Sequence, residues 1–339
     1  MVGGMKMTEW NKDKEKKILQ KYRFTLSVRI IKILIACLFL FWVYMMIVSI
    51  SYDSTHLDRK HAYYSKLATD WTAPNVQEDF GSIVQSEITP FLTQKISYPV
   101  SKLVGKEYKT IGEMEISKTL LSTFSQKGIR YFTQNESDTS HFFLPEHPKT
   151  GKKLSANNDP GVWSKLDKLH EGTVGELAFS TTEFMSAEEL LELLKPFDVD
   201  VLWAPLYTGE FQSFEPSGYG GGGDQISINY VFGLTGGREI SNDYLSEGKM
   251  TYLKEDSLEY SQKMMLENMK YLLEEESKAY YESFLGLSFL DERYQYLQKN
   301  GFTVYGAVIT GPVKELLKLQ NVEEIQGVRL GDLDYWNWE

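Results

Sequence analysis

The residues that most resemble a chemical site are a glycine run, Gly218 to Gly223, followed by Asp224. A phosphate-binding loop requires a Lys-Ser/Thr pair at the start of a helix, or glycines spaced G-x-G-x-x-G between a strand and a helix. Here the aspartate would repel phosphate, and the residues that follow have the pattern of a strand. The run therefore predicts a flexible loop, with a ligand-covering role left open, and not a nucleotide site.

Other residue types that could carry catalysis are present without the required spacing. The five histidines are His56, His61, His141, His147 and His170. A zinc site built from His141 and His147 would need further ligands that the sequence does not place, and neither G-x-S-x-G nor H-E-x-x-H occurs. Acidic runs such as Glu274 to Glu276 are more typical of a solvated helix face. We therefore predict no catalytic set, no metal and no cofactor.

The amino-terminal residues instead have the pattern of a helix that binds a surface or a partner. Ile18, Leu19, Tyr22 and Leu26 fall on one stripe of a helix, and Lys14, Lys17 and Lys21 fall on the neighbouring stripe. Such a helix lies on anionic headgroups, or it places its apolar stripe in the groove of a partner protein. The residues predicted to contact a partner are Trp10, Ile18, Leu19, Tyr22 and Leu26.

The next segment, Ile33 to Tyr52, contains twenty uncharged residues. As a helix it would be about 30 Å long, which matches the hydrocarbon core of a bilayer. The alternative is a cleaved signal peptide, but this apolar region is longer than is usual for one. We predict a retained, single-pass membrane helix.

Charge predicts the orientation of that helix. Residues 1–32 carry nine basic and three acidic groups, a net charge of +6, which leaves −17 beyond the span because the chain total is −11. Basic residues mark the cytoplasmic flank, so the amino terminus is expected inside and the acidic bulk outside. The negative charge also argues against nucleic acid as a partner. The single cysteine, Cys37, lies in the span, so the outer region has no disulfide.

The outer region predicts strands and helices in alternation. Strands are expected at 108–117, 129–133, 173–180, 199–207, 226–232, 302–310 and 327–330, and helices at 187–195, from Asp256 through Leu273, at 288–299 and at 313–319. Residues 186–189 are predicted to form a capping box for the first of these helices, Asp256 to cap the second, and Asn300-Gly301 to end the third. Residues 53–103 are expected to be loops with short apolar patches. The fold class is thus a single-pass membrane helix plus an extracytoplasmic α+β domain, with helices on a mixed sheet that is partly ferredoxin-like.

Four regions follow from this pattern. They are a cytoplasmic basic tail (1–32), a transmembrane helix (33–52), a membrane-proximal region with short strands (53–150) and a sensor-like α/β domain (151–339). The aromatic end, Tyr335 to Trp338, is expected to dock on the body of the protein or on a partner.

Several of these segments resemble the membrane-anchored anti-sigma factors that have amino-terminal and carboxy-terminal sigma-factor-regulator domains. The matching segments are KKILQKYRFTLSVRIIKILI (16–35), TVGELAFSTTEFMSAEELLELLKPFDVDVLWAPLY (173–207), YGAVITGPVKELLKL (305–319) and DLDYWNW (332–338). The resemblance implies a tail that sequesters an extracytoplasmic-function sigma factor at the bacterial cell membrane, and an outer domain that senses the envelope.

The tail departs from that family in offering only about one helix. One helix buries little surface, so tight binding would require a second small membrane protein or a homodimer. The rival interpretation is a membrane-tethered envelope enzyme or ligand-binding module with a passive tail.

Overall fold

The computed structural model describes residues 12–79, 83–121, 124–133, 139, 141–157, 159–222, 225–242, 244 and 246–335. They fall into two compact units that meet between Thr55 and His56 in the chain. The first unit contains one helix, α1 (Lys12–Thr55). The second unit begins with α2 (Leu57–Thr72), β1 (Gln77–Glu78), β2 (Gln85–Ile88), β3 (Thr93–Val104), β4 (Glu107–Thr119) and β5 (Ser125–Tyr131).

The remaining elements of the second unit form its carboxy-terminal half. They are α3 (Pro160–Lys168), β6 (Thr173–Ser186), α4 (Ala187–Leu194), β7 (Asp200–Tyr207), β8 (Tyr219–Gly220), β9 (Ser227–Ile228), β10 (Gly233–Leu234), β11 (Arg238–Ile240), β12 (Glu247–Lys249), η1 (Glu255–Ser257), α5 (Leu258–Glu275), η2 (Ala279–Phe284), α6 (Leu290–Asn300), β13 (Thr303–Pro312), α7 (Val313–Lys318), η3 (Leu319–Asn321) and β14 (Ile325–Tyr335).

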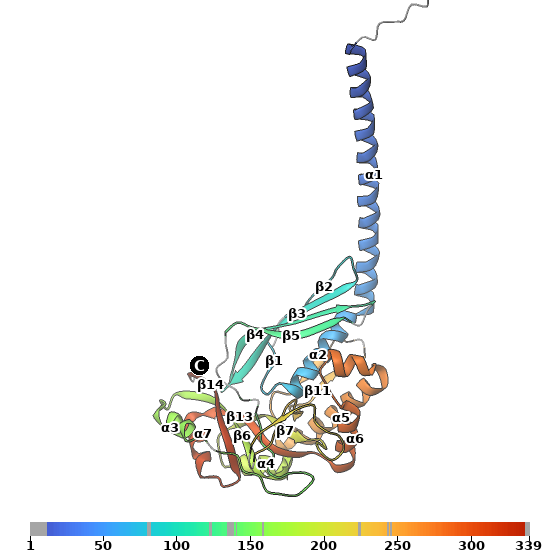
Figure 1. The fold of residues 1–339 in the computed structure, drawn as a ribbon. Helices are drawn as coiled ribbons and strands as arrows, with labels where there is room; N and C mark the ends of the chain where they lie inside the picture. Colours follow the sequence, from blue (N-terminus) through green and yellow to red (C-terminus); the bar gives the residue numbers. More distant parts are fainter. Residues whose placement is uncertain are drawn as a thin grey trace, which may run out of the picture. The chain divides into compact units, whose positions relative to one another are not determined.

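Helix α1 contains the whole predicted span and continues on its amino-terminal side without a break (Figure 1). It is long and apolar enough to cross a membrane. The expected single helix through residues 33–52 is therefore present. Its last residue, Thr55, is followed by His56 with a φ of 49°, a left-handed conformation that ends the helix before α2 begins.

Residues 57–104 correct the expectation of loops with short patches. They form a sixteen-residue helix, α2, and a twelve-residue strand, β3. Helix α2 carries the apolar side chains Tyr63, Leu67 and Trp71 on one face, and all three are buried. Pro99 does not interrupt β3, because a register shift between Val100 and Ser101 follows it and accommodates the irregularity.

Two larger sheets organise the second unit. Strands β1 to β5 form one, with β1-β3-β4-β5 in order and β2 also paired with β3. The other has the order β10-β7-β13-β6-β14 (Figure 1). Every pair between these named strands is antiparallel, so the expectation of a mixed sheet is wrong. The reason is that β6 and β7, which run parallel across α4, are separated in the sheet by β13.

Local sequence signals explain several element ends. The Ser186 side chain accepts a hydrogen bond from the backbone of Glu189 at 3.1 Å, and the Glu189 carboxylate accepts one from the Ser186 backbone at 2.7 Å, which confirms the predicted capping box of α4. Pro205 lies where the β7–β13 ladder loses its regular register. Gly301, with a φ of 78°, ends α6 as expected.

Two expectations were wrong in detail. The strand predicted at 226–232 is only two residues long in the structure, because Tyr230 adopts a left-handed conformation (φ 59°) that bends the chain between β9 and β10. Asp256 does not cap α5. It lies inside the short 3-10 turn η1, and the residue before α5, Ser257, makes no side-chain cap.

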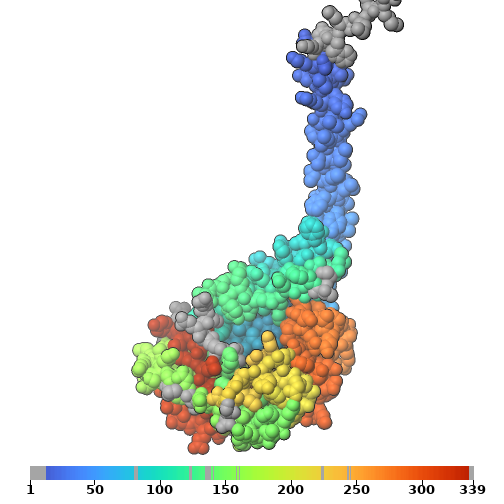
Figure 2. All heavy atoms as spheres, viewed as in Figure 1, coloured from blue at the N-terminus to red at the C-terminus, as the bar shows by residue number. Residues whose placement is uncertain are grey.

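One continuous core joins the two halves of the second unit. It includes apolar residues of α2 and β3 together with those of β6, β7, β13, α5 and α7. In Figure 2 only a small part of α2 (blue) is visible between the β2–β5 sheet and the later segments. Helix α2 is therefore the central element on which both halves pack.

Candidate functional site

The predicted partner-binding residues of the tail lie together on α1. Ile18, Leu19, Tyr22 and Leu26 share one face of the helix, and their exposed fractions range from 45% for Leu26 to 67% for Tyr22. The fifth predicted contact, Trp10, lies outside the described residues. Four apolar side chains thus form one exposed stripe, the tail stripe.

Basic residues border the tail stripe. Lys21 and Arg29 line the same shallow surface depression as Ile18, Tyr22 and Leu26. An apolar stripe with a cationic border suits a groove that is apolar at its centre and acidic at its rim. The arrangement supports binding.

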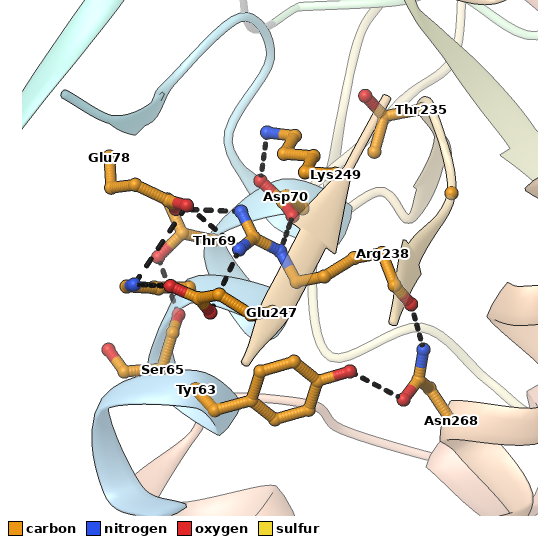
Figure 3. A network of polar contacts seen from close by, with 12 residues as sticks. Tyr63, Ser65, Thr69, Asp70, Glu78, Thr235, Arg238, Glu247, Lys249 and Asn268 are labelled. Atoms are coloured by element: carbon orange, nitrogen blue, oxygen red, sulfur yellow. Dashed lines mark hydrogen bonds and ion pairs between the residues drawn. The ribbon is translucent and has the colours of Figure 1, made fainter. Parts of the chain in front are cut away.

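The second notable site is a buried network of charges in the second unit, which we call the charge network (Figure 3). Its centre is Arg238 on β11, whose Nε donates to Asp70 Oδ2 at 2.7 Å and whose Nη atoms donate to Glu78 at 2.6 and 2.9 Å. Lys249 donates to the other oxygen of Asp70 at 2.7 Å. Lys66 pairs with Glu247, which also lies 3.4 Å from Arg238.

The charge network is closed and balanced. Three cations (Lys66, Arg238, Lys249) face three carboxylates (Asp70, Glu78, Glu247), so the formal charges cancel, and Glu247, which is 32% exposed, is the member that reaches solvent. Burial alone would raise the pKa of Glu78, but the Arg238 guanidinium outweighs burial and holds that pKa at about 2. Burial tends to lower the pKa of Arg238, yet Asp70 and Glu78 hold it well above its usual value. Glu78 and Arg238 are therefore charged at neutral pH.

Backbone and aromatic groups fix the charge network in place. The Trp203 indole donates to the Asp70 carbonyl at 3.0 Å. Asn268 donates to the Arg238 carbonyl at 2.9 Å and accepts from the Tyr63 hydroxyl at 2.9 Å. These contacts bring α2, β7, β11 and α5 to a single point.

A second buried contact joins the same two halves of the second unit. Lys102 on β3 donates to Glu176 on β6 at 3.0 Å, and Asn75 donates to the other oxygen of Glu176 at 2.9 Å. Glu176 is completely buried, and Lys102 is nearly so. The charge network and the Lys102–Glu176–Asn75 contact therefore both hold the two halves of the second unit together.

Sequence reasoning missed the charge network, although one signal pointed to it. Lys66 and Asp70 are four residues apart and lie on the apolar face of α2 with Tyr63 and Leu67. Charged side chains on an otherwise apolar helix face indicate buried charges whose partners lie elsewhere in the fold. Their partners on β11 and β12 could not be inferred, because those strands are too short to predict.

The other sequence candidates do not form a chemical site in the described part of the chain. Among those residues, no group of three or more His, Cys, Asp or Glu side chains is placed to hold a metal ion. The start of the glycine run forms β8, which pairs with β9 as a short hairpin and does not lead into a helix. Gly223, Asp224 and residues 336–339 lie outside the described residues.

Comparison with known proteins identifies the class. The sigma factor regulator C-terminal model matches residues 166–332, and the sigma factor regulator N-terminal model matches residues 16–109. The chain therefore belongs to the sigma factor regulators and is an anti-sigma factor with both domains. This confirms the resemblance inferred from the sequence.

A curated relative is the probable anti-sigma-M factor YhdL of Bacillus subtilis (strain 168). It is 23% identical over 273 residues, which cover 79% of this chain and 67% of that protein. No solved structure matches the chain. Within the matched ranges, Asp70 and Glu78 lie in the N-terminal domain and Arg238 and Lys249 in the C-terminal domain, so the charge network joins the two.

Proposed function

We propose that this anti-sigma factor is anchored by residues 33–52 and sequesters an extracytoplasmic-function sigma factor with its cytoplasmic tail, residues 1–32. Residues 53–150 and 151–339 lie outside and regulate that binding. The basic tail of net charge +6 supports this orientation. The name of the relative, an anti-sigma-M factor, supports a sigma factor as the partner. The protein acts by binding, without catalysis.

One observation carries the proposal. The tail stripe belongs to the same unbroken helix as the span, since α1 runs from Lys12 to Thr55. Residues 12–32 extend about 30 Å beyond the span, so the stripe stands clear of the headgroups along part of its length. A helix that only marked topology would need no exposed apolar stripe at that distance. The N-terminal family match begins at residue 16, just before the stripe.

The test is a charge placed on the stripe. The double variant Leu19→Glu and Tyr22→Glu should release the sigma factor and raise transcription of its regulon, because a groove cannot bury two carboxylates without partners. The matched control is Gln20→Glu with Ser27→Glu, which adds the same charge on another face of the same exposed helix. The control should bind normally. Unchanged binding and transcription in the Leu19/Tyr22 variant would show that the stripe is not the contact face.

The size of the stripe motivates a further part of the proposal. One helix face buries less surface than a stable protein–protein interface requires. A second small membrane protein or a second copy of this chain therefore completes the binding unit. Crosslinking in the membrane, followed by mass spectrometry, distinguishes these two partners. Only a homodimer gives a crosslinked species that contains this chain alone.

We also propose that the sheet of the C-terminal domain is ferredoxin-like. The strand order β14-β6-β13-β7, with α4 between β6 and β7 and α7 between β13 and β14, supports this. Helices α5 and α6 and the β11–β12 hairpin are then insertions between the second and third strands. The insertion carries Arg238 and Lys249 to the N-terminal domain.

A further inference from the structure

The β1–β5 sheet of the outer unit ends in two apolar turns. The β2–β3 turn carries Phe91, which is 85% exposed, and the β4–β5 turn carries Leu121 and Phe124, which are 79% and 59% exposed. Leu120 in the second turn donates its backbone N–H to Leu92 in the first at 2.9 Å. The two turns therefore form one apolar tip. Exposed aromatic and aliphatic residues gathered in this way usually mark an interaction surface.

Contacts with α2 show at which end of the sheet the tip lies. Moving along α2, His61 contacts Gln94 at 2.5 Å and Ser65 contacts Tyr98 at 3.1 Å. Further along, Asn75, just after the helix, bonds the backbone of Leu103. Helix α2 and strand β3 thus run in the same direction, and the first residues of both lie at the same end (Figure 1). The tip, which immediately precedes β3, is at the end where α2 begins.

Chain connectivity limits how far that end can be from the bilayer. Helix α2 begins at Leu57, and only residues 53–56 separate it from Tyr52, the last residue of the predicted span. Even a fully extended chain would cover at most about 18 Å over these five steps. The start of α2, and with it the apolar tip, is therefore tethered close to the end of the predicted span, within reach of the headgroup region.

From this geometry we infer that the apolar tip, formed by Phe91, Leu121 and Phe124, inserts into the outer interface of the lipid bilayer. Phenylalanine and leucine side chains gain free energy when they leave water for the acyl boundary, as they do in interfacial helices. A lipid surface fits the tip better than a protein groove because the side chains project from two turns and leave the strands behind them polar. The exposed pair Glu87 and Lys95 lies on those strands. The inference rests on the orientation proposed above.

The experiment places a single fluorophore on the full-length protein with Cys37→Ser. A thiol-reactive nitrobenzoxadiazole is attached at Phe91→Cys or Leu121→Cys, and the protein is reconstituted in vesicles of phosphatidylethanolamine and phosphatidylglycerol. Tyr131→Cys is the matched control, since Tyr131 is also an exposed aromatic residue on the same sheet but lies at the other end of β5. The quencher is spin-labelled lipid, which reaches the labelled protein in either orientation that the protein takes in the vesicle membrane.

We expect lipid quenching at positions 91 and 121 to exceed that at position 131 by about tenfold, as partition of one apolar side chain would give. In the double variant Phe91→Ser and Leu121→Ser, a fluorophore at Phe124→Cys should lose this quenching. Quenching at 91 and 121 that is no stronger than at 131 would overturn the inference.

A separate marker tests the orientation alone. Lys106, in the exposed β3–β4 turn at the opposite end of the sheet, is replaced by cysteine and exposed to a membrane-impermeant maleimide on intact cells. Labelling at Lys106→Cys supports the proposed orientation, and its absence overturns that orientation. Because the lipid-quenching result does not depend on the side of the membrane, failure of the apolar tip and failure of the proposed topology give different results.

Discussion

Arg238 and Asp70 are 168 residues apart in the chain, yet Nε of Arg238 lies 2.7 Å from Oδ2 of Asp70, with both side chains almost fully buried. Asp70 comes from the N-terminal regulator domain and Arg238 from the C-terminal one. Two family domains that are separate in sequence are thereby joined by a buried, hydrogen-bonded ion pair.

The first prediction concerns this ion pair. Arg238→Met should lower the free energy of unfolding by about 3–5 kcal/mol, because it leaves Asp70 and Glu78 buried without their guanidinium partner. Chemical denaturation of the full chain in detergent micelles measures the change. Arg130→Met is the control, since Arg130 pairs with Glu113 and Glu115 on an exposed surface, and its midpoint should not move. Equal effects in both variants would refute the structural role of the charge network.

A second prediction concerns acid. The pKa of Glu78 is lowered from 4.5 to about 2, where the attraction of Arg238 outweighs burial. Its folded-state pKa is below the unfolded value, so the stability it contributes is complete above pH 4.5 and is lost as the pH falls towards 2. Denaturation midpoints between these pH values should fall less steeply in Glu78→Gln than in the native protein. Glu274→Gln, on an exposed helix face, should keep the native slope.

A third prediction concerns His61, which is buried against the rings of Tyr280 and Phe284. Burial lowers its pKa from 6.5 to about 4, with smaller contributions from its hydrogen bond to Gln94 and from the nearby Lys118, Lys60 and Asp58. The unfolded chain binds a proton in this range and the folded one does not. Stability is therefore complete above pH 6.5 and decreases by about 3 kcal/mol as the pH falls to 4.

Thermal unfolding of His61→Asn against pH tests this. The variant should have a lower midpoint at neutral pH but a flatter profile between pH 6.5 and 4. His170→Asn, at an exposed position, serves as the control and should retain the native profile. A native slope in the His61 variant would mean that other groups cause the acid sensitivity.

A fourth prediction tests the packing of the β10-β7-β13-β6-β14 sheet. A Cβ atom at Gly233 would overlap the Trp203 indole, so Gly233→Ala should lower the free energy of unfolding by at least about 2 kcal/mol. Gly128→Ala on β5 meets no neighbouring atom and should leave stability unchanged or slightly higher. Denaturant midpoints of the two alanine variants provide the comparison, and equal midpoints would contradict the packing described for Trp203.

The sequence predicted the elements that have strong local signals. The apolar run of α1, the capping box at Ser186 and the glycine stop at Gly301 are all set by neighbouring residues, and the structure has them. Helix α2 was not predicted because its buried residues include the charged side chains Lys66 and Asp70. These charges interrupt the apolar pattern by which a helix is recognised.

The charge network and the antiparallel order of the β10-β7-β13-β6-β14 sheet could not be predicted for a different reason. Both depend on contacts between residues more than a hundred positions apart, such as Asp70 with Arg238 in the network and Leu177 with Ile309 in the sheet. Local propensity contains no information on such pairs. The tail stripe was predictable because helical periodicity alone places Ile18 and Tyr22 on one face.

The unbroken course of α1 has a consequence for signalling. A continuous helix turns as a rigid shaft, and successive residues along it are about 100° apart around its axis. A rotation of α1 by that angle, applied near Thr55, would also rotate the amino-terminal end of the helix. Arg23 would then take the place of Tyr22 on the side that faces a bound protein. In the topology proposed above, a modest torque at the Thr55 end of α1 would thus exchange an aromatic ring for a positive charge on the tail stripe, without any change in the length of the helix.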